Sequence, residues 1–355
     1  MIREIVKNNI GIIYLDRAEK INALNLDMIY DIYDILEKWK DDGRIRAVLF
    51  DSLADKGFCA GGDLKEVYED YLTNDGEKDK DKFFRTEFKL DKYIEGYEKP
   101  IISHWFGITM GGGIGLTINS DIKIADESTN WAMPETRLGF VPDVGVCKEI
   151  SKLPQALGQY LALTGTSLGA SDLIKYKLAD FYIKASNYED IINKLFDLSQ
   201  DYEGDKLSDE FRSVLKEYEN EDNTSKIEDD LEKIEEYFNL DSYREIYEKL
   251  KENPRDDFAR KTLANQEERF PFMLSLQFEK YFISKDLTYA ETIDLDYEIL
   301  KYSVEIGSME EGIRVTMIDK DDFPNWPIQS LDEVDMAKVK DLLGIAKTYK
   351  ERFTK

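Results

Sequence analysis

The sequence predicts an α/β protein with a mostly helical C-terminal region. Two apolar, β-prone runs, 47–50 and 100–106, are each followed by a glycine-rich turn and then by a stretch that favours a helix. Later in the chain, apolar side chains recur at helical spacing among acids, lysines and tyrosines. We therefore expect an α/β core over residues 1–188 and a mostly helical region over residues 189–355.

The elements are expected in a regular order along the chain. Residues 2–14 alternate around an asparagine-rich turn, which predicts a β-hairpin. Asn25 or Asp27 can cap a helix over 28–39, where apolar residues recur at helical spacing. The further expected elements are the strand 47–50, a helix after Asp63, a helix over 83–97, the strand 100–106, a short helix over 114–119, the strand 121–125, helices over 155–163 and 171–178, amphipathic helices between 256 and 307, and a final helix over 334–353.

Composition limits the classes of protein to which the chain can belong. At 355 residues it can bury a large core, and a formal charge of −26 argues against nucleic acid or an anionic membrane as a partner. The two cysteines, Cys59 and Cys147, have no metal-ligand spacing, and sparse cysteine is typical of a reducing compartment. The N-terminus lacks the apolar core of a secretory signal, so we expect a cytoplasmic protein that binds no metal.

The stretch from the second strand onward carries most of the chemical information. Gly107 and the run 111–113 allow a tight turn, and the short helix that follows leaves bare N–H groups at its start. Such a turn can bind an oxyanion. Two carboxylates, Glu135 and Asp143, follow in a stretch with almost no other charge. Oxyanion donors near two acids indicate chemistry on a carbonyl group.

Several catalytic templates do not fit. The run Gly165–Gly169 matches G-x-S-x-G, but that arrangement needs a histidine after the serine, and the single histidine, His104, precedes it. His104 lies among apolar residues of an expected strand, so we expect a core histidine. The glycines do not form G-x-G-x-x-G, and G-x-x-x-x-G-K-[ST] is absent from the sequence. Carboxylate chemistry beside an oxyanion hole is what remains.

Three motifs, with a fourth segment near the C-terminus, resemble those of the crotonase superfamily: GFCAGGDL over 57–64, GITMGGGIGL over 107–116, MPETRLGFVPDVG over 133–145, and EEGIRVTMIDKDDFPNW over 310–326. The Glu135/Asp143 pair makes the chain most similar to the 3-hydroxyisobutyryl-CoA hydrolase branch. This resemblance implies a spiral of ββα units, an acyl-CoA substrate, and thioester hydrolysis in valine catabolism. It implies no separate cofactor, because coenzyme A is part of the substrate, and relatives often form trimers.

The resemblance also implies roles for individual residues of the reaction. The amides of Ala60 and Gly112 would form the oxyanion hole. Glu135 would attack the thioester carbonyl or activate water, and Asp143 would orient the acyl 3-hydroxyl or water and share proton transfer. From the residues alone, Glu135 is equally a first-turn acid after a proline, and Asp143 equally a turn residue.

Further positions are implied to contact the substrate. Glu87, Gly111, Gly112 and Asp63 fall where the branch binds its ligand. A solvated helical acid is the competing interpretation of Glu87, and a helix cap that of Asp63. Three basic residues near the motifs are weaker candidates for contacting the phosphates of coenzyme A, and each is equally a surface charge: Arg17, Lys20 and Lys56.

Two other functions remain open from the sequence. Family hydratases use two glutamates, and the position of one of them is Gly115 here, which carries no carboxylate. An enoyl-CoA hydratase or isomerase would therefore have to use Glu135 alone. The branch usually continues after Gly145 with a glycine and an aromatic residue, whereas this chain has Val146-Cys147-Lys148. This departure leaves the acyl group open and makes a catalytically idle acyl-CoA-binding protein the third possibility.

Overall fold

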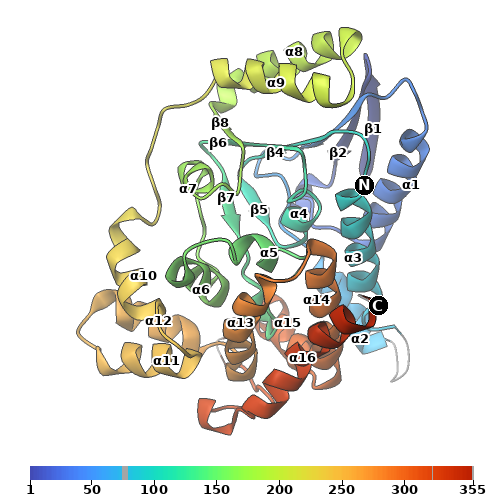
Figure 1. The fold of residues 1–355 in the computed structure, drawn as a ribbon. Helices are drawn as coiled ribbons and strands as arrows, with labels where there is room; N and C mark the ends of the chain where they lie inside the picture. The colour runs from blue at the N-terminus through green and yellow to red at the C-terminus, as the bar shows by residue number, and fades with distance from the viewer. Residues whose placement is uncertain (74–78, 322, 354–355) are drawn as a thin grey trace. The chain divides into compact units, whose positions relative to one another are not determined.

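The computed structural model is a mixed α/β fold, as the sequence predicts (Figure 1). It describes residues 1–73, 79–321 and 323–353, and side chains for these residues except those of 73 and 345–353. The strands are β1 Ile2–Lys7, β2 Ile10–Leu15, β3 Ala47–Ser52, β4 Ile101–Trp105, β5 Ile108–Met110, β6 Ile122–Asp126, β7 Asn130–Ala132 and β8 Phe181–Ile183. The α-helices are α1 Leu26–Lys40, α2 Leu64–Thr73, α3 Lys82–Glu95, α4 Gly112–Gly115, α5 Cys147–Ile150, α6 Gln155–Thr164, α7 Ala170–Lys175, α8 Tyr188–Asp201, α9 Gly204–Glu217, α10 Leu231–Phe238, α11 Tyr243–Glu252, α12 Asp257–Glu267, α13 Pro271–Ser284, α14 Tyr289–Glu305, α15 Ser308–Ile313 and α16 Met336–Phe353. Short 3₁₀ and π turns complete the described chain: η1 Ala18–Lys20, η2 Glu135–Leu138, η3 Ala185–Asn187, η4 Glu228–Asp230, η5 Arg314–Asp319 and η6 Leu331–Glu333.

The chain divides into two compact units, and each is built from three separate segments. The first unit comprises Met1–Asp63, Lys89–Trp131 and Ser167–Lys226, and the second comprises Leu64–Phe88, Ala132–Thr166 and Ile227–Lys355. The boundary expected at residue 188 therefore needs correction. Helices α8 and α9 lie after that residue but pack on the first unit, whereas α2 and α6 lie before it and contact helices of the C-terminal part.

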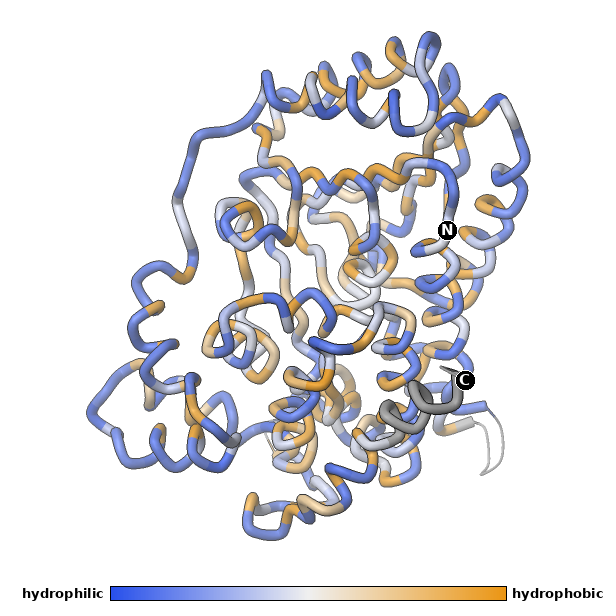
Figure 2. The backbone as a smooth tube through the Cα atoms, viewed as in Figure 1, coloured by the Kyte–Doolittle hydropathy of each residue, from blue (hydrophilic) through white to orange (hydrophobic). Residues whose placement is uncertain are grey.

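A six-stranded sheet forms the centre of the first unit, in the order β1-β2-β3-β4-β6-β8. The β1–β2 pair is antiparallel, which confirms the predicted hairpin, and the remaining neighbours are parallel. Helices α8 and α9 run side by side (Figure 1), and hydrophobic and hydrophilic residues alternate along both (Figure 2). Their apolar residues, among them Leu195 and Phe211, share one core with Leu49, Ile102 and Ile124 of the sheet. This cover accounts for the apolar residues on one face of the parallel strands.

Local signals in the sequence mark the starts of two helices. Asn25 precedes α1, and its side-chain oxygen accepts a hydrogen bond from the Met28 amide at 3.1 Å. Pro271 occupies the first turn of α13 in the second unit. Helix α13 is buried on most of its circumference because α5, α6, α11 and α16 all contact it. It is therefore the central helix of the second unit.

The single histidine belongs to a buried polar network of the first unit. His104 on β4 lies between two carboxylates, with Nε2 3.2 Å from Asp126 Oδ2 and Nδ1 3.7 Å from Asp51 Oδ1. The Tyr188 ring stacks on His104 at 3.8 Å between centroids, and its hydroxyl donates to Asp51 Oδ2 at 2.8 Å. Burial lowers the pKa of His104, but the hydrogen bonds to Asp126 and Asp51 outweigh it, so the pKa is raised. The prediction of a core histidine is confirmed.

This network should make the stability of the protein depend on pH. A histidine whose pKa is raised by folding stabilises the native state fully below about pH 6.5, and this contribution is lost as the pH rises through the raised value. At pH 6, His104→Gln should lower the free energy of unfolding by about 3–5 kcal/mol, because two buried carboxylates lose their cation. Urea denaturation at pH 6 and pH 9 measures this. The exposed control Lys206→Met should leave the curve unchanged, and equal loss for His104→Gln at both pH values would contradict the prediction.

Candidate active site

The two glycine-rich turns that were predicted to act together do lie side by side in the first unit. Cys59 pairs with the second turn, because its amide donates to Ile108 and its carbonyl accepts from Met110, both at 3.0 Å. Gly113 makes this approach possible because it has no Cβ atom. Any other residue there would place a Cβ 2.5 Å from Cys59 Cβ, which is too close. Only glycine at this position lets the start of α4 reach the turn over 57–63.

The amides of these turns differ in whether they can still bind a ligand. The Ala60 N–H already donates to the Ile21 carbonyl at 3.0 Å. Within the described chain, the amides of Gly62 and Gly112 have no hydrogen-bond acceptor. An oxyanion role for Ala60 would require this hydrogen bond to break, so it stays a prediction, whereas the amides of Gly62 and Gly112 are candidates that need to break none. The sequence could not reveal this, because the competing acceptor belongs to the distant η1 turn.

Gly111 takes part in the second turn through its backbone. Its φ of +50° starts helix α4, and its carbonyl accepts from the amides of Ile114 and Gly115. A positive φ favours glycine, so the residue type has a structural reason here. Contact of Gly111 with a substrate stays a prediction.

Asp63 lies at the end of the first turn and is buried in an ion-pair cluster. Its Oδ2 atom is 2.8 Å from Arg17 Nη2 and 3.2 Å from Lys20 Nζ. Two of the basic residues considered for the phosphates of coenzyme A therefore neutralise a carboxylate of their own unit. Lys56 is exposed. Substrate contact by Asp63 stays a prediction, and the structure gives this residue a structural role as well.

Glu87 lies on α3 in the second unit and is only 3% exposed. This burial excludes the alternative of a solvated helical acid. Asp91, one turn further along α3, is also buried. Burying a carboxylate is unfavourable without compensating interactions. Its role in binding substrate stays a prediction.

Glu135 and Asp143 form a pair of buried carboxyl groups in the second unit, with exposures of 7% and 4%. Glu135 begins the 3₁₀ turn η2, which ends at Gly139, and its Oε2 atom has no hydrogen-bond partner among the described residues. Burial raises the pKa of Glu135 well above its usual value, and the charge of Asp143 raises it further. The structure thus places the two predicted acids close enough for the charge of one to act on the other, in a buried environment.

The protonation of Asp143 depends on residues that the sequence did not single out. Burial and the negative charge of Asp296 raise the pKa of Asp143 to about 8, although the positive charge of Lys280 acts in the opposite direction. Asp143 is therefore largely protonated at pH 7, while sharing its surroundings with Glu135. Two acids coupled in this way can hold one proton between them, which suits them for different tasks.

Arg269 holds the turn that carries Glu135. Its Nε donates to Thr136 Oγ1 at 2.9 Å and its Nη2 to the Thr164 carbonyl at 2.6 Å. Ser308 fixes the other end of the turn by donating to the Gly139 carbonyl at 2.8 Å. Sequence reasoning missed both residues, because their hydrogen-bond partners are more than a hundred residues away in the chain.

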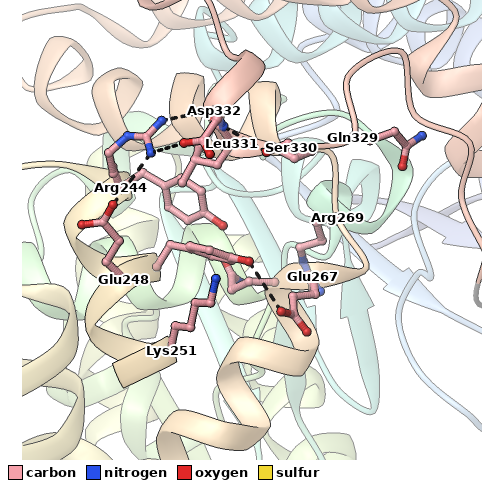
Figure 3. Close-up of a pocket in the computed structure, with 13 residues that line it drawn as sticks. Arg244, Glu248, Lys251, Glu267, Arg269, Gln329, Ser330, Leu331 and Asp332 are labelled. Atoms are coloured by element: carbon pink, nitrogen blue, oxygen red, sulfur yellow. Dashed lines mark hydrogen bonds and ion pairs between the residues drawn. The ribbon is translucent and has the colours of Figure 1, made fainter. Parts of the chain in front are cut away.

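Arg269 also lines a polar pocket of about 410 Å³ in the second unit (Figure 3). Both basic and acidic side chains line its wall. One such pair is Arg244 and Asp332, whose Nη1 and Oδ1 atoms are 2.7 Å apart. Neither Glu135 nor Asp143 is among the residues that line this pocket. The pocket therefore does not include the pair of acids, although Arg269 contacts both the pocket and the turn that carries Glu135.

The sequence was also compared with known protein families and with individual proteins. The model of the enoyl-CoA hydratase/isomerase family matches residues 10–343. The chain belongs to this family. The matched residues include both glycine-rich turns and the Met133–Gly145 segment that contains both acids.

Individual proteins of known name are also similar to this chain. The chain is 33% identical to 3-hydroxyisobutyryl-CoA hydrolase, mitochondrial, of Xenopus laevis, over 91% of this chain and 83% of the relative. It is 31% identical to the protein of the same name from Homo sapiens, with the same coverage. A solved structure, a carnitinyl-CoA dehydratase from Mycobacterium thermoresistibile, matches with a TM-score of 0.84 and 27% identity over 96% of both chains.

The comparisons overturn the expectation of a cytoplasmic protein. Both named hydrolases are labelled mitochondrial, which conflicts with that expectation. The expectation rested on sparse cysteine and on scattered charge at the N-terminus, and neither distinguishes one reducing compartment from another. Among the described residues, none of the helices has the length and apolar character needed to cross a bilayer.

Proposed function

We propose that this protein is an acyl-CoA thioester hydrolase that acts on 3-hydroxyisobutyryl-CoA, in the degradation of valine. The observation that carries the proposal is the buried pair of Glu135 and Asp143, with the raised pKa values of both carboxyl groups. Support comes from the relatives named 3-hydroxyisobutyryl-CoA hydrolase at 31–33% identity. No separate cofactor is needed, because coenzyme A is part of the substrate.

The glycine-rich turns would stabilise the charge that develops on the thioester oxygen. The amides of Gly62 and Gly112 would donate to this oxygen as the carbonyl carbon becomes tetrahedral. Loss of one such donor typically costs about 3 kcal/mol of transition-state stabilisation. Neither amide has another acceptor in the described chain, so both can serve the substrate without breaking a hydrogen bond.

The two carboxyl groups would supply the acid–base chemistry. Glu135, as a carboxylate, either attacks the carbonyl carbon or takes a proton from the attacking water. The carbon–sulfur bond then breaks, and the sulfur of coenzyme A takes a proton from the carboxyl pair, for which protonated Asp143 is suited. If Glu135 attacks directly, water subsequently cleaves the acyl-enzyme anhydride. Both routes consume one water molecule and release the acid and free coenzyme A.

A substrate panel tests the proposal. The purified protein is incubated with 3-hydroxyisobutyryl-CoA and with crotonyl-CoA, while free thiol and enoyl absorbance are followed. We expect thiol release from the first substrate. Loss of enoyl absorbance without thiol release would indicate a hydratase instead, and binding of either ester without reaction would indicate the idle acyl-CoA-binding protein. Either of these two outcomes overturns the proposal.

The close contact between the two glycine-rich turns gives a further prediction. Gly113→Ala places a Cβ 2.5 Å from Cys59 Cβ, so the turns must move apart. A displacement of about 1 Å at a reacting group can cost about 100-fold in rate. We expect a loss of this size in kcat/KM for thiol release. Gly43→Ala is the matched control, because a Cβ at Gly43 meets nothing within 4 Å. Equal activity of the two variants would show that the spacing of the turns is unimportant.

A further inference from the structure

A second buried charge pair lies beside the acids and has no part in the proposed chemistry. Lys280 on α13 and Asp296 on α14 are both completely buried, and Nζ lies 2.5 Å from Oδ1. Removing two charges from water costs several kcal/mol per ion, and a well-packed apolar pair is often as stable. An ion pair at this position therefore calls for a reason other than stability.

Each member of this pair also holds the turn that carries Asp143. Lys280 Nζ donates to the Pro142 carbonyl at 2.5 Å, immediately before Asp143. The Gly145 amide donates to Asp296 Oδ2 at 2.9 Å, two residues after it. The ion pair thus bonds to the backbone on both sides of the acid.

The backbone between these two hydrogen bonds is in an unfavourable conformation. Val144 has a φ of +49°, which is unusual for a β-branched residue and costs on the order of 1–3 kcal/mol. The Tyr289 hydroxyl donates to the Val144 carbonyl at 3.0 Å. Gly145 has a φ of +71°, and a Cβ there would lie 2.3 Å from Tyr289 Cε2. A turn of this kind persists only when its surroundings hold it.

We propose that Lys280 and Asp296 are positioning residues that lock the Pro142–Gly145 turn and set the orientation and charge environment of Asp143. Neither residue is assigned contact with substrate, so both act through Asp143. The kinetic part of this inference rests on the proposed hydrolase function. Its electrostatic part concerns the carboxyl group itself and can be measured without any substrate.

The two members of the pair should act on Asp143 in opposite directions. The negative charge of Asp296 raises the pKa of Asp143, and the positive charge of Lys280 lowers it. Three more titratable groups belong to the same surroundings: Glu135 on η2, Cys147 on α5, and Asp294 on α14, which acts on Asp296. These three groups remain in place when Lys280 or Asp296 is changed. The sign of each shift in the pKa of Asp143 therefore reports on the Lys280–Asp296 pair.

Two single variants separate positioning and charge from mere packing. Asp296→Asn keeps an oxygen that can accept from the Gly145 amide but removes the negative charge, so the alkaline limb of the pH–rate profile should move to lower pH. Lys280→Met removes the positive charge and the donor to Pro142, so the limb should move to higher pH. Both should lower kcat by about 10- to 100-fold and change KM by less than about threefold. A purely structural role would not produce shifts of opposite sign.

A double variant and a matched control keep the test decisive. Lys280→Met/Asp296→Leu replaces the whole pair with apolar groups, which buried pairs often tolerate without loss of stability. It should remain folded by circular dichroism and lose at least tenfold in kcat. The exposed pair Lys301–Glu298, also on α14, is the control, and Glu298→Gln should change neither kcat nor the pH profile. A folded double variant with native kcat would overturn the inference.

A titration without substrate separates failure of this inference from failure of the proposed function. Carboxyl groups are labelled with ¹³C, and the Asp143 signal is identified by its loss in Asp143→Asn. Opposite pKa shifts in Asp296→Asn and Lys280→Met would support the inference even if no thioester were hydrolysed. Unchanged or parallel shifts in an active hydrolase would overturn the inference and leave the function intact.

Discussion

Replacement of Glu135 by glutamine is expected to reduce thiol release from 3-hydroxyisobutyryl-CoA by about 1,000- to 10,000-fold. The amide is nearly isosteric but can neither attack the carbonyl carbon nor accept a proton from water. Because Glu135 Oε2 has no hydrogen-bond partner in the described chain, the variant should fold normally. Steady-state kinetics at pH 7 measures the loss, which should appear in kcat.

The control for this variant is Glu149→Gln on α5. Glu149 pairs with Lys152 at the surface, with Nζ 2.6 Å from Oε1. The same chemical change at this position should leave kcat and KM unaltered, since surface pairs contribute little. If Glu135→Gln retained native turnover, Glu135 would be neither nucleophile nor base, and the proposed mechanism would have to be abandoned.

Replacement of Asp143 by asparagine is expected to abolish most activity and yet to stabilise the fold at alkaline pH. Folding raises the pKa of this carboxyl from 3.8 to about 8, chiefly by burial. Because the folded protein binds this proton more tightly than the unfolded chain does, ionisation of the carboxyl group favours unfolding. The free energy of unfolding therefore falls as the pH rises from about 4 through about 8. The full rise corresponds to a penalty on the order of 5 kcal/mol above pH 8, which asparagine does not suffer.

Urea denaturation of the native protein and of Asp143→Asn at pH 5 and pH 9 tests this effect. The difference in unfolding free energy should favour the variant far more at pH 9 than at pH 5. In the kinetic measurement, the native profile should fall with an apparent pKa near 8 as the pair loses its last proton, and Asp143→Asn should lose that limb. A variant no more stable than the native protein at pH 9 would show that Asp143 is not held protonated by burial.

These two experiments separate catalysis from stability at one site. Buried acids that are suited to proton transfer commonly lower the stability of the protein that contains them. Glu135 and Asp143 are both buried, and neither pKa lies at its usual value. A gain in stability together with a loss of turnover is what a functional carboxyl pair predicts, whereas a structural pair would lose stability.

Much of the fold could be predicted because its signals are local. The hairpin of β1 and β2 and the Asn25 cap of α1 each depend on a few adjacent residues. The division at residue 188 could not be predicted correctly. Composition changes near that point, but the apolar faces of α8 and α9 are buried on the sheet that precedes them.

Within the candidate site, residue types were easier to predict than their environment. The motifs identify Glu135, Asp143 and the glycines of both turns. They do not reveal that the Ala60 amide already donates to the Ile21 carbonyl, whereas the Gly62 amide has no acceptor in the described chain. Nor do they reveal Lys280, because a lysine in an amphipathic helix normally points to solvent.

The sequence by itself indicated the N-terminal hairpin, the strands over 47–50, 100–106 and 121–125, the two glycine-rich turns and the two acids, but not the short strands β5, β7 and β8. These follow from spacing and turn chemistry within short segments. Only the tertiary structure decided which amides remain unbonded and which charges surround Asp143. Hydrogen-bond partners and burial are supplied by residues distant in the chain, and local sequence carries no record of them.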